Sequence, residues 1–159
     1  LTAGHPGLAL AGVSSASLAG GRVAESFPHL APALRDAAFV TQEALAAMLA
    51  GFGGQRVALL SAAPHVVSAG VLAGLIGTAE AAGVDLRVVD VSSDFRFRRA
   101  ADFQAVYKEP HGAPQLLERF TCALPEHVPG VPGPCIGHPG CFASSMLLAL
   151  VPLLKAGLT

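Results

Sequence analysis

Charged side chains are scarce in this sequence of 159 residues: they make up 13% of it, against ~25% in an ordinary soluble domain. The net charge is −1 with His neutral, and the Lys and Arg residues are dispersed along the chain. A nucleic-acid or membrane-surface partner would require a basic patch, so neither is expected. Small molecules are the expected ligands. Because 52% of the residues are apolar, part of the surface is expected to meet further protein.

Long apolar runs and paired cysteines are also missing. No run approaches the ~20 residues of a membrane span, and the first residues lack the basic, apolar and small-residue order of a signal peptide. The cysteines, Cys122, Cys135 and Cys141, are odd in number and lack the spacing of a disulfide framework. The sequence therefore predicts a protein of a reducing compartment, which makes the cytoplasm the expected location.

What is present is the pattern of an α/β protein. Between two apolar strands, Arg56–Ser61 and Leu86–Asp90, residues 66–82 carry apolar side chains at helical spacing and end at Gly83. A strand, a helix and a strand joined by short links cross over into a parallel sheet. The predicted fold is α/β, with a Rossmann-like parallel sheet and flanking helices. The strand at Arg56–Ser61 is continuously apolar, so burial on both of its faces is expected.

The other expected elements follow from apolar runs, caps and breakers. They are a buried strand at Leu8–Val13, a strand at 37–40, a helix capped by Thr41 that ends near Leu49, helical turns at Ala100–Tyr107 and Pro114–Arg119, a strand at Cys135–Ile136 and a helix that starts at Cys141 and stops at Gly157. Residues 27–35, with two prolines, are expected to form an irregular connection, and residues 128–134 a rigid surface loop.

Polar side chains follow several of these strands, and ligands of parallel sheets gather where the strands end. The hydroxyl groups of Ser14 and Ser15 are candidates to bind a ribose or a phosphate, although the same residues are ordinary in turns. His65, which follows Pro64, either contacts a ligand or is an ordinary loop residue. These positions therefore predict one ligand-binding edge of the sheet.

The segment Gly137–Ser145 holds the candidate nucleophile. Cys141 is expected at the start of an apolar helix, where unpaired backbone N–H groups and the helix dipole favour a thiolate. Pro139 fixes the approach of the chain, and Gly140 lets a substrate come close to the backbone. The alternative is that Cys141 is a small buried side chain without reactivity.

Three segments resemble the N-acetyl-gamma-glutamyl-phosphate reductases of the aspartate-semialdehyde dehydrogenase-like superfamily, and they occur in the family's order. They are VDVSSDFRF at 89–97, ALPE at 123–126 and GHPGCFASS at 137–145. The resemblance covers essentially the whole chain but only part of the family's length. It implies that residues 1–140 form a partial dinucleotide-binding domain and that residues 141–159 begin the catalytic and dimerisation domain.

The resemblance also implies an internal fragment. A cofactor turn of the form G-x-G-x-x-G does not occur before Leu8, and the family's version would lie upstream of Leu1. The family's His acid/base and most of its α+β substrate and dimerisation domain would lie downstream of Thr159. The fragment alone is therefore expected to be inactive, and the complete enzyme to be a homo-oligomer, either a dimer or a tetramer.

The family's residue roles carry over to matching positions of this sequence. The implied set is Cys141 as the acyl-accepting nucleophile, Ser92 and Arg96 for the substrate phosphate, and Ser14, Ser15, Pro64, His65 and Pro139 for the cofactor, with no metal. An Arg fork suits a phosphate, but an ion pair between Arg96 and Asp94 is the alternative. Ser92 and Ser93 either donate to the phosphate or close the turn.

The implied reaction is the reductive dephosphorylation of an acyl phosphate with NADP, with NAD as the alternative cofactor. N-acetyl-glutamyl 5-phosphate would become N-acetyl-glutamate 5-semialdehyde, a step of arginine biosynthesis, through a cysteine thioester. A related substrate, the carrier-linked aminoadipyl phosphate of lysine biosynthesis, is the alternative within the same chemistry.

Two readings of another class stay open. The side chains of Cys122, His127, Cys135, His138 and Cys141 are close enough in sequence to form a structural zinc site, although they lack the usual Cys-x-x-Cys pair. The second reading is that the chain is a non-catalytic remnant of the fold. His138 stands where the family usually has Asn, which implies either a local rearrangement or an altered proton relay.

The cofactor preference gives a prediction. Ala16 stands where the family's Ser-Ser-Arg loop has Arg, so one contact to the 2′-phosphate is missing, worth ~1.5–3 kcal/mol or roughly one to two decades of discrimination. The preference for NADP should be weak unless Arg22 compensates. In the full-length enzyme, Ala16→Arg should raise the ratio of NADPH to NADH efficiency. An unchanged ratio would show that this loop does not meet the ribose.

Overall fold

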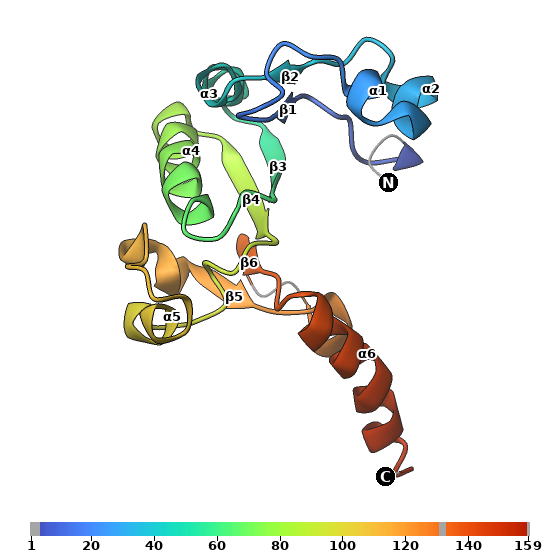
Figure 1. Cartoon of the computed structure of the whole chain (residues 1–159), viewed down its shortest axis with the longest axis vertical. Helices are drawn as coiled ribbons and strands as arrows, with labels where there is room; N and C mark the ends of the chain where they lie inside the picture. Colours follow the sequence, from blue (N-terminus) through green and yellow to red (C-terminus); the bar gives the residue numbers. More distant parts are fainter. Residues whose placement is uncertain (1–3, 131–132, 159) are drawn as a thin grey trace.

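A computed structural model describes residues 4–130 and 133–158. Its centre is a four-stranded sheet in which all neighbouring strands are parallel (Figure 1). The strands lie in the order β3 (Arg56–Ser61), β4 (Asp85–Asp90), β6 (Cys135–Gly137) and β5 (Phe120–Cys122). The predicted α/β class with a parallel sheet is therefore confirmed.

The predicted crossover unit is confirmed as well. Helix α4 (Ser68–Ala82) connects β3 to β4 and buries the apolar positions that the spacing indicates, among them Leu72, Leu75 and Ile76. It ends at Gly83, whose φ of 68° is left-handed. Because Gly has no Cβ, it adopts this conformation without a steric penalty and the chain can turn into β4.

The strand register brings the strand ends together. Ser61 of β3 lies opposite Asp90 of β4, and Gly137 of β6 lies opposite both Asp90 and Cys122 of β5. The last residues of all four strands therefore form one row. The segments that follow β3, β4 and β6 start side by side at this edge of the sheet, which is where parallel sheets bind ligands.

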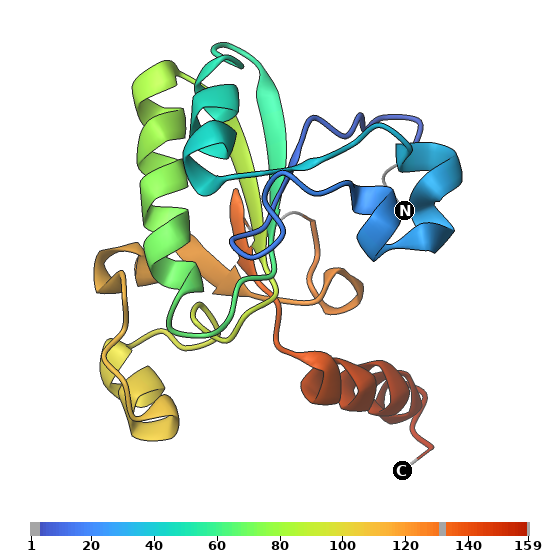
Figure 2. The same ribbon diagram turned by 45° about the horizontal axis from the view of Figure 1, so that its top comes forward.

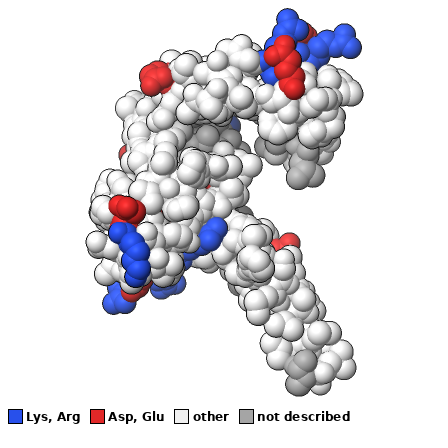
Figure 3. All heavy atoms as spheres, in the orientation of Figure 1, with Lys and Arg blue, Asp and Glu red and all other residues white. Residues whose placement is uncertain are grey.

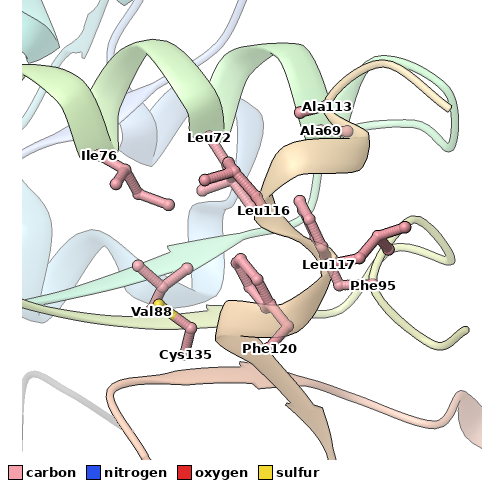
Figure 4. Close-up of a cluster of buried hydrophobic side chains, with 10 residues drawn as sticks. All are labelled: Ala69, Leu72, Ile76, Val88, Phe95, Ala113, Leu116, Leu117, Phe120 and Cys135. Atoms are coloured by element: carbon pink, nitrogen blue, oxygen red, sulfur yellow. The ribbon is translucent and has the colours of Figure 1, made fainter. Parts of the chain in front are cut away.

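The main core lies between the sheet and one layer of helices (Figure 4). Phe95 stacks on Phe120 with ring centroids 3.7 Å apart. Helix α4 packs on the same cluster, together with side chains of β4 and β6. The 3-10 helix η3 (Pro114–Arg119), predicted as a helical turn, adds Leu116 and Leu117. The buried cluster is Ala69, Leu72, Ile76, Val88, Phe95, Ala113, Leu116, Leu117, Phe120 and Cys135.

Three more helices lie where the sequence predicts them. Helix α3 (Gln42–Ala50) starts at Thr41, whose Oγ1 accepts a hydrogen bond from Ala44 N–H at 3.2 Å, and it packs beside α4. Helix α5 (Ala100–Tyr107) has its predicted bounds. Helix α6 (Cys141–Lys155) begins at the predicted cysteine and ends before Gly157, and it projects away from the sheet (Figure 2).

The predicted buried strand at Leu8–Val13 is wrong in extent and in burial. The strand is β1 (Val13–Ser14), which pairs in parallel with β2 (Phe39–Val40) in a separate two-stranded sheet. The side chains of Leu8 and Leu10 are 45% and 38% exposed. An apolar run becomes a strand only beside a partner strand, and residues 8–12 have none within the described chain.

The prediction that β3 is buried on both faces is also wrong. Helices α3 and α4 lie on one face of the sheet (Figure 2). On the other face the side chain of Leu60 is 68% exposed and that of Val89 39%. Continuous apolarity predicts burial on both faces only when both are covered, and no helix in the described residues covers Leu60.

The N-terminal connection is more regular than predicted. Helix α1 (Val23–Ser26) is followed by η2 (Pro28–Leu30) and α2 (Ala31–Leu34), so residues 28–34 of the expected irregular segment are helical. The two prolines stand in first turns, where a missing N–H is tolerated. Part of the predicted loop 128–134, residues 131–132, lies outside the described residues. The remaining helix, η4, spans Pro125–His127.

Exposed apolar side chains cluster on α6. Phe142 is 86% exposed and Leu154 60%, and the face of α6 seen in Figure 3 is almost free of charge, whereas charged side chains gather near the N-terminal helices and near α5. Among the described residues, no helix has the length and apolar character needed to cross a bilayer.

Gly137 gives a stability prediction. A Cβ at this position would lie 2.9 Å from the carbonyl carbon of Phe95, so Gly137→Ala should force β6 away from the 92–96 turn and destabilise the fold by about 1–3 kcal/mol. The matched control is Gly77→Ala, on the exposed side of α4 with nothing within 4 Å, which should stabilise by about 0.5–1 kcal/mol. Urea unfolding measures both. Equal midpoints for the two variants would contradict the close approach.

Candidate active site

Two buried carboxyl groups organise the turn that follows β4. Asp90 and Asp94 are both fully buried, and Ser92 lies between them, with its Oγ 2.6 Å from Asp90 Oδ2 and 3.2 Å from Asp94 Oδ2. No ion pair with either carboxyl group occurs in the part of the chain that the structure describes. Hydrogen bonds from neighbouring segments therefore have to stabilise both groups.

These hydrogen bonds tie the turn to the segment after β3. Ser68, the first residue of α4, donates to Asp90 Oδ1 at 2.7 Å and lies 2.8 Å from Ser61 Oγ. Asp94 Oδ1 accepts from Val66 N–H at 2.8 Å. Val66 has a φ of 73°, an unfavourable conformation for a β-branched residue. The bond to Asp94 helps to hold this strained loop in place.

The candidate cofactor residues Pro64 and His65 lie in that loop. Both are exposed, and the ring of His65 packs against that of Tyr107, with centroids 5.3 Å apart. The loop is therefore fixed from two sides, by Asp94 below and by Tyr107 beside it, while its outer surface remains accessible to a ligand.

Two further candidate cofactor residues, Ser14 and Ser15, lie apart from this group. Ser14 is the last residue of β1, and Ser15 Oγ accepts a hydrogen bond from Leu18 N–H at 3.3 Å. No hydrogen bond within the described residues joins Ser14 or Ser15 to the loops after β3, β4 or β6. Ser14 and Ser15 belong to the separate two-stranded sheet, whereas Pro139 lies between His138 and Gly140, the two residues that Arg96 contacts.

Arg96 and the start of α6 are in direct contact. Arg96 Nε donates to the His138 carbonyl oxygen at 3.1 Å, and its Nη2 donates to the Val91 carbonyl oxygen at 3.4 Å. A Cβ on Gly140 would lie 3.0 Å from the guanidinium carbon and from Nη1. The absence of a side chain at Gly140 is what lets the guanidinium lie one residue before Cys141.

The alternative ion pair between Arg96 and Asp94 does not form. The Asp94 carboxyl group is turned into the core, and Arg96 uses two of its nitrogens on backbone oxygens. Its Nη1 makes no hydrogen bond to a described residue. A planar guanidinium held in this way keeps donors available for an anion at the helix start.

Ser92 and Ser93 have different surroundings. The Ser92 hydroxyl faces Asp90, and the Asp94 N–H donates to Ser92 Oγ at 3.2 Å, so this side chain closes the turn. That is the alternative given by the sequence. Ser93 Oγ is buried and has no hydrogen-bond partner among the described residues. No local pattern of the sequence indicates which way either hydroxyl points.

The three cysteines have different environments. Burial raises the pKa of the Cys135 thiol, which lies in the main core. Burial also raises the pKa of the Cys122 thiol, although the nearby Arg96 charge acts in the opposite direction. Cys122 and Cys141 are both exposed, and Cys141 holds the first position of α6. Thiolate formation is therefore opposed by burial at Cys122 and Cys135.

The zinc alternative finds no support in the described residues: no three His, Cys, Asp or Glu side chains there lie close enough together to hold a metal ion. A cavity of 520 Å³ is lined by Arg96, Thr121 and Cys122 among others. Arg96 thus contacts Gly140 and also lines a space large enough for a small anion.

Sequence reasoning missed the side chains that hold these loops. Ser68 and Tyr107 lie in predicted helices, and only the folded chain brings them to Asp90 and to His65. The spacing of Asp90, Ser92 and Asp94 after a buried strand was the available signal. All three residues end or directly follow β4 and are buried, so this polar set faces the core.

Comparison with known proteins gives a consistent result. No family model matches the chain. The chain is 38% identical over 160 residues to a curated protein of Ectopseudomonas mendocina, 36% to one of Azotobacter vinelandii and 35% to one of Pseudomonas aeruginosa. Each is named N-acetyl-gamma-glutamyl-phosphate reductase. The alignments cover 99% of this chain, which spans 43% of each relative. The resemblance seen in the three segments is confirmed.

Thiol reactivity is the prediction from this geometry. Iodoacetamide should label Cys141 first, by about tenfold over Cys122, because Cys141 stands at a helix start, whereas partial desolvation raises the pKa of the exposed Cys122 and Cys135 is buried. Peptide mapping after short labelling times measures the order. In urea the three sites should label at similar rates, which serves as the control. Preferential labelling of Cys122 or Cys135 in the folded chain would contradict the assignment of Cys141.

Proposed function

We propose that this chain, similar along 99% of its length to the named reductases, provides the acyl-transfer site of an N-acetyl-gamma-glutamyl-phosphate reductase. The reaction is the NADP-dependent conversion of N-acetyl-glutamyl 5-phosphate to N-acetyl-glutamate 5-semialdehyde in arginine biosynthesis. One observation carries the proposal. An exposed thiol starts α6, and the residue before it contacts the guanidinium of Arg96, whose Nη1 bonds to no described residue.

The first step uses the residues of this chain. The Cys141 thiolate attacks the acyl carbon, the carbon–sulfur bond forms, and the bond from that carbon to the phosphate oxygen breaks. Inorganic phosphate leaves with the electron pair of the broken bond, and a thioester remains. The guanidinium of Arg96 stabilises the charge on the leaving phosphate, and the first N–H groups of α6 stabilise the oxyanion.

The second step needs a nicotinamide cofactor, which would supply a hydride to the thioester carbon when it is bound. The carbon–sulfur bond would then break, so that the aldehyde is released and Cys141 regains its thiolate with the electron pair of that bond. The exposed residues at the strand ends suit such a group: Pro64 and His65 present an accessible surface on a fixed loop. Ser14 is exposed and Ser15 keeps its hydroxyl proton free, so both hydroxyls are available to a ribose or its phosphate. Ser92, whose hydroxyl is used by Asp90, acts on the phosphate only through the turn that carries Arg96.

A chimera tests the proposed function. This chain replaces the matched 160-residue segment of the Ectopseudomonas mendocina relative, and the aldehyde, NADP and inorganic phosphate are supplied. Formation of NADPH that depends on phosphate is expected. The Cys141→Ser variant should lose this activity, and the control variant Cys122→Ser should keep it. No activity from a folded chimera would favour the non-catalytic alternative. Activity only with the aminoadipyl aldehyde would assign the lysine-pathway substrate.

Arg96 gives a separate prediction in the same assay. Arg96→Lys keeps the positive charge but removes the planar fork, so the apparent affinity for phosphate should fall by about tenfold. The thermal midpoint should change little, because Arg96 holds two backbone oxygens and no buried carboxylate. An unaltered dependence on phosphate, or on arsenate in its place, would refute the role. A collapse of the midpoint would show that Arg96 serves the fold instead.

A further inference from the structure

The start of α6 is capped in an unusual way. Its cap residue is Gly140, which has no side chain to bind the first helical N–H groups. In a common capping arrangement, a Glu or Gln in the first turn reaches back to bind the N–H of the cap residue. Here the Gly140 N–H donates to His138 Nδ1 at 3.1 Å, so the acceptor comes from two residues before the cap.

The second ring nitrogen of His138 reaches into the helix. His138 Nε2 lies 3.1 Å from the Oγ of Ser144, a buried residue in the first turn of α6. Ser144 N–H donates to the Gly140 carbonyl oxygen at 2.9 Å. The imidazole therefore connects the residue before Cys141 with a residue after it.

These bonds assign the tautomer of His138. A backbone N–H can only donate, so Nδ1 is the unprotonated acceptor. In the neutral ring the proton is then on Nε2 and is donated to Ser144 Oγ. While both bonds are made, neither nitrogen has a lone pair free to take a proton from the Cys141 thiol. The geometry therefore favours a positioning role over a proton relay.

The backbone of His138 is fixed as well. Its N–H donates to the Asp90 carbonyl oxygen at 2.8 Å, and its carbonyl oxygen accepts from Arg96 Nε at 3.1 Å. All four polar groups of His138 are thus bonded, two to the end of the sheet and its turn and two to the start of α6. His138 therefore holds the start of the helix that carries Cys141 in a fixed position relative to the end of β4.

We propose that His138 is a positioning residue whose imidazole holds Gly140, and with it the Cys141 thiol, at the start of α6. The Nδ1 atom accepts the same hydrogen bond that an Asn side-chain oxygen accepts from the backbone N–H two residues further on. The proposal rests on the proposed function only in taking Cys141 as the reacting thiol.

Alkylation of the chain itself provides the test. The rate constant for iodoacetamide at Cys141 is compared with that at Cys122 in the same molecule. His138→Ala should lower the ratio by about three- to tenfold, the effect of losing one or two hydrogen bonds. His138→Asn should keep the ratio within about twofold, because Asn restores the acceptor for Gly140. His138→Gln, whose side chain is one carbon longer, should not restore it.

Matched variants separate positioning from general stability. His29→Ala removes an exposed histidine of η2 and should leave the ratio unchanged. Ser144→Ala should lower the ratio less than His138→Ala, because the Gly140 bond remains. A ratio unchanged in His138→Ala, or lowered equally in the Ala and Asn variants, would overturn the proposal. So would an equal slowing of both thiols, since that indicates a loss of overall structure.

Nitrogen NMR of the wild-type chain keeps the proposal testable if a variant fails to fold. The expected result is a neutral ring protonated on Nε2, together with slow amide exchange at Gly140. A ring protonated on Nδ1 would overturn the proposal. If the wild-type Cys141 is not the first thiol to react, the proposed function fails at its nucleophile. The tautomer and the Gly140 exchange still decide the role of His138 in that case.

Discussion

The fold around the candidate site depends on keeping the buried carboxyl groups of Asp90 and Asp94 satisfied. Removing a carboxyl group from water without hydrogen-bond donors is costly. The donors come from three residues: the hydroxyl and backbone N–H of Ser92, the Ser68 hydroxyl and the Val66 backbone N–H. The network is therefore complete only when the loop after β3, the start of α4 and the turn after β4 are all in position. A change in any of these segments leaves a buried polar group without a partner.

The same turn divides its residues between the core and the site. Asp94 and Phe95 face inward, to the carboxylate network and to the stacked ring of Phe120, while Arg96 faces the start of α6. Because the inward side chains are fixed by packing and hydrogen bonds, the guanidinium is held before any substrate arrives. Such preorganisation is the condition under which a charged group stabilises a leaving phosphate without reorganising during the reaction.

The sequence was sufficient for those parts of the fold whose signals are local. The crossover helix, its Gly83 stop, the Thr41 cap and the bounds of α5 depend on spacing and caps within a few residues, and all are confirmed. The Leu8–Val13 strand and the two-faced burial of β3 depend on what lies beside them, which apolarity does not report. For the site, motif resemblance indicated Cys141 and Arg96. The inward direction of Ser92 and the contact of Tyr107 with His65 depend on segments that are distant in sequence.

The row of strand ends has a consequence for folding kinetics. Gly137 pairs with Asp90 and with Cys122, so β6 is placed between two strands that are made earlier in the chain. Pairing of strands distant in sequence requires closure of long loops and is slow compared with local helix formation. Helices such as α4 can form early, but the surroundings of Cys141 arise only when β6 has joined β4. Pulse labelling of this thiol during refolding therefore reports when β6 joins the sheet. It does not report the earlier collapse of the chain.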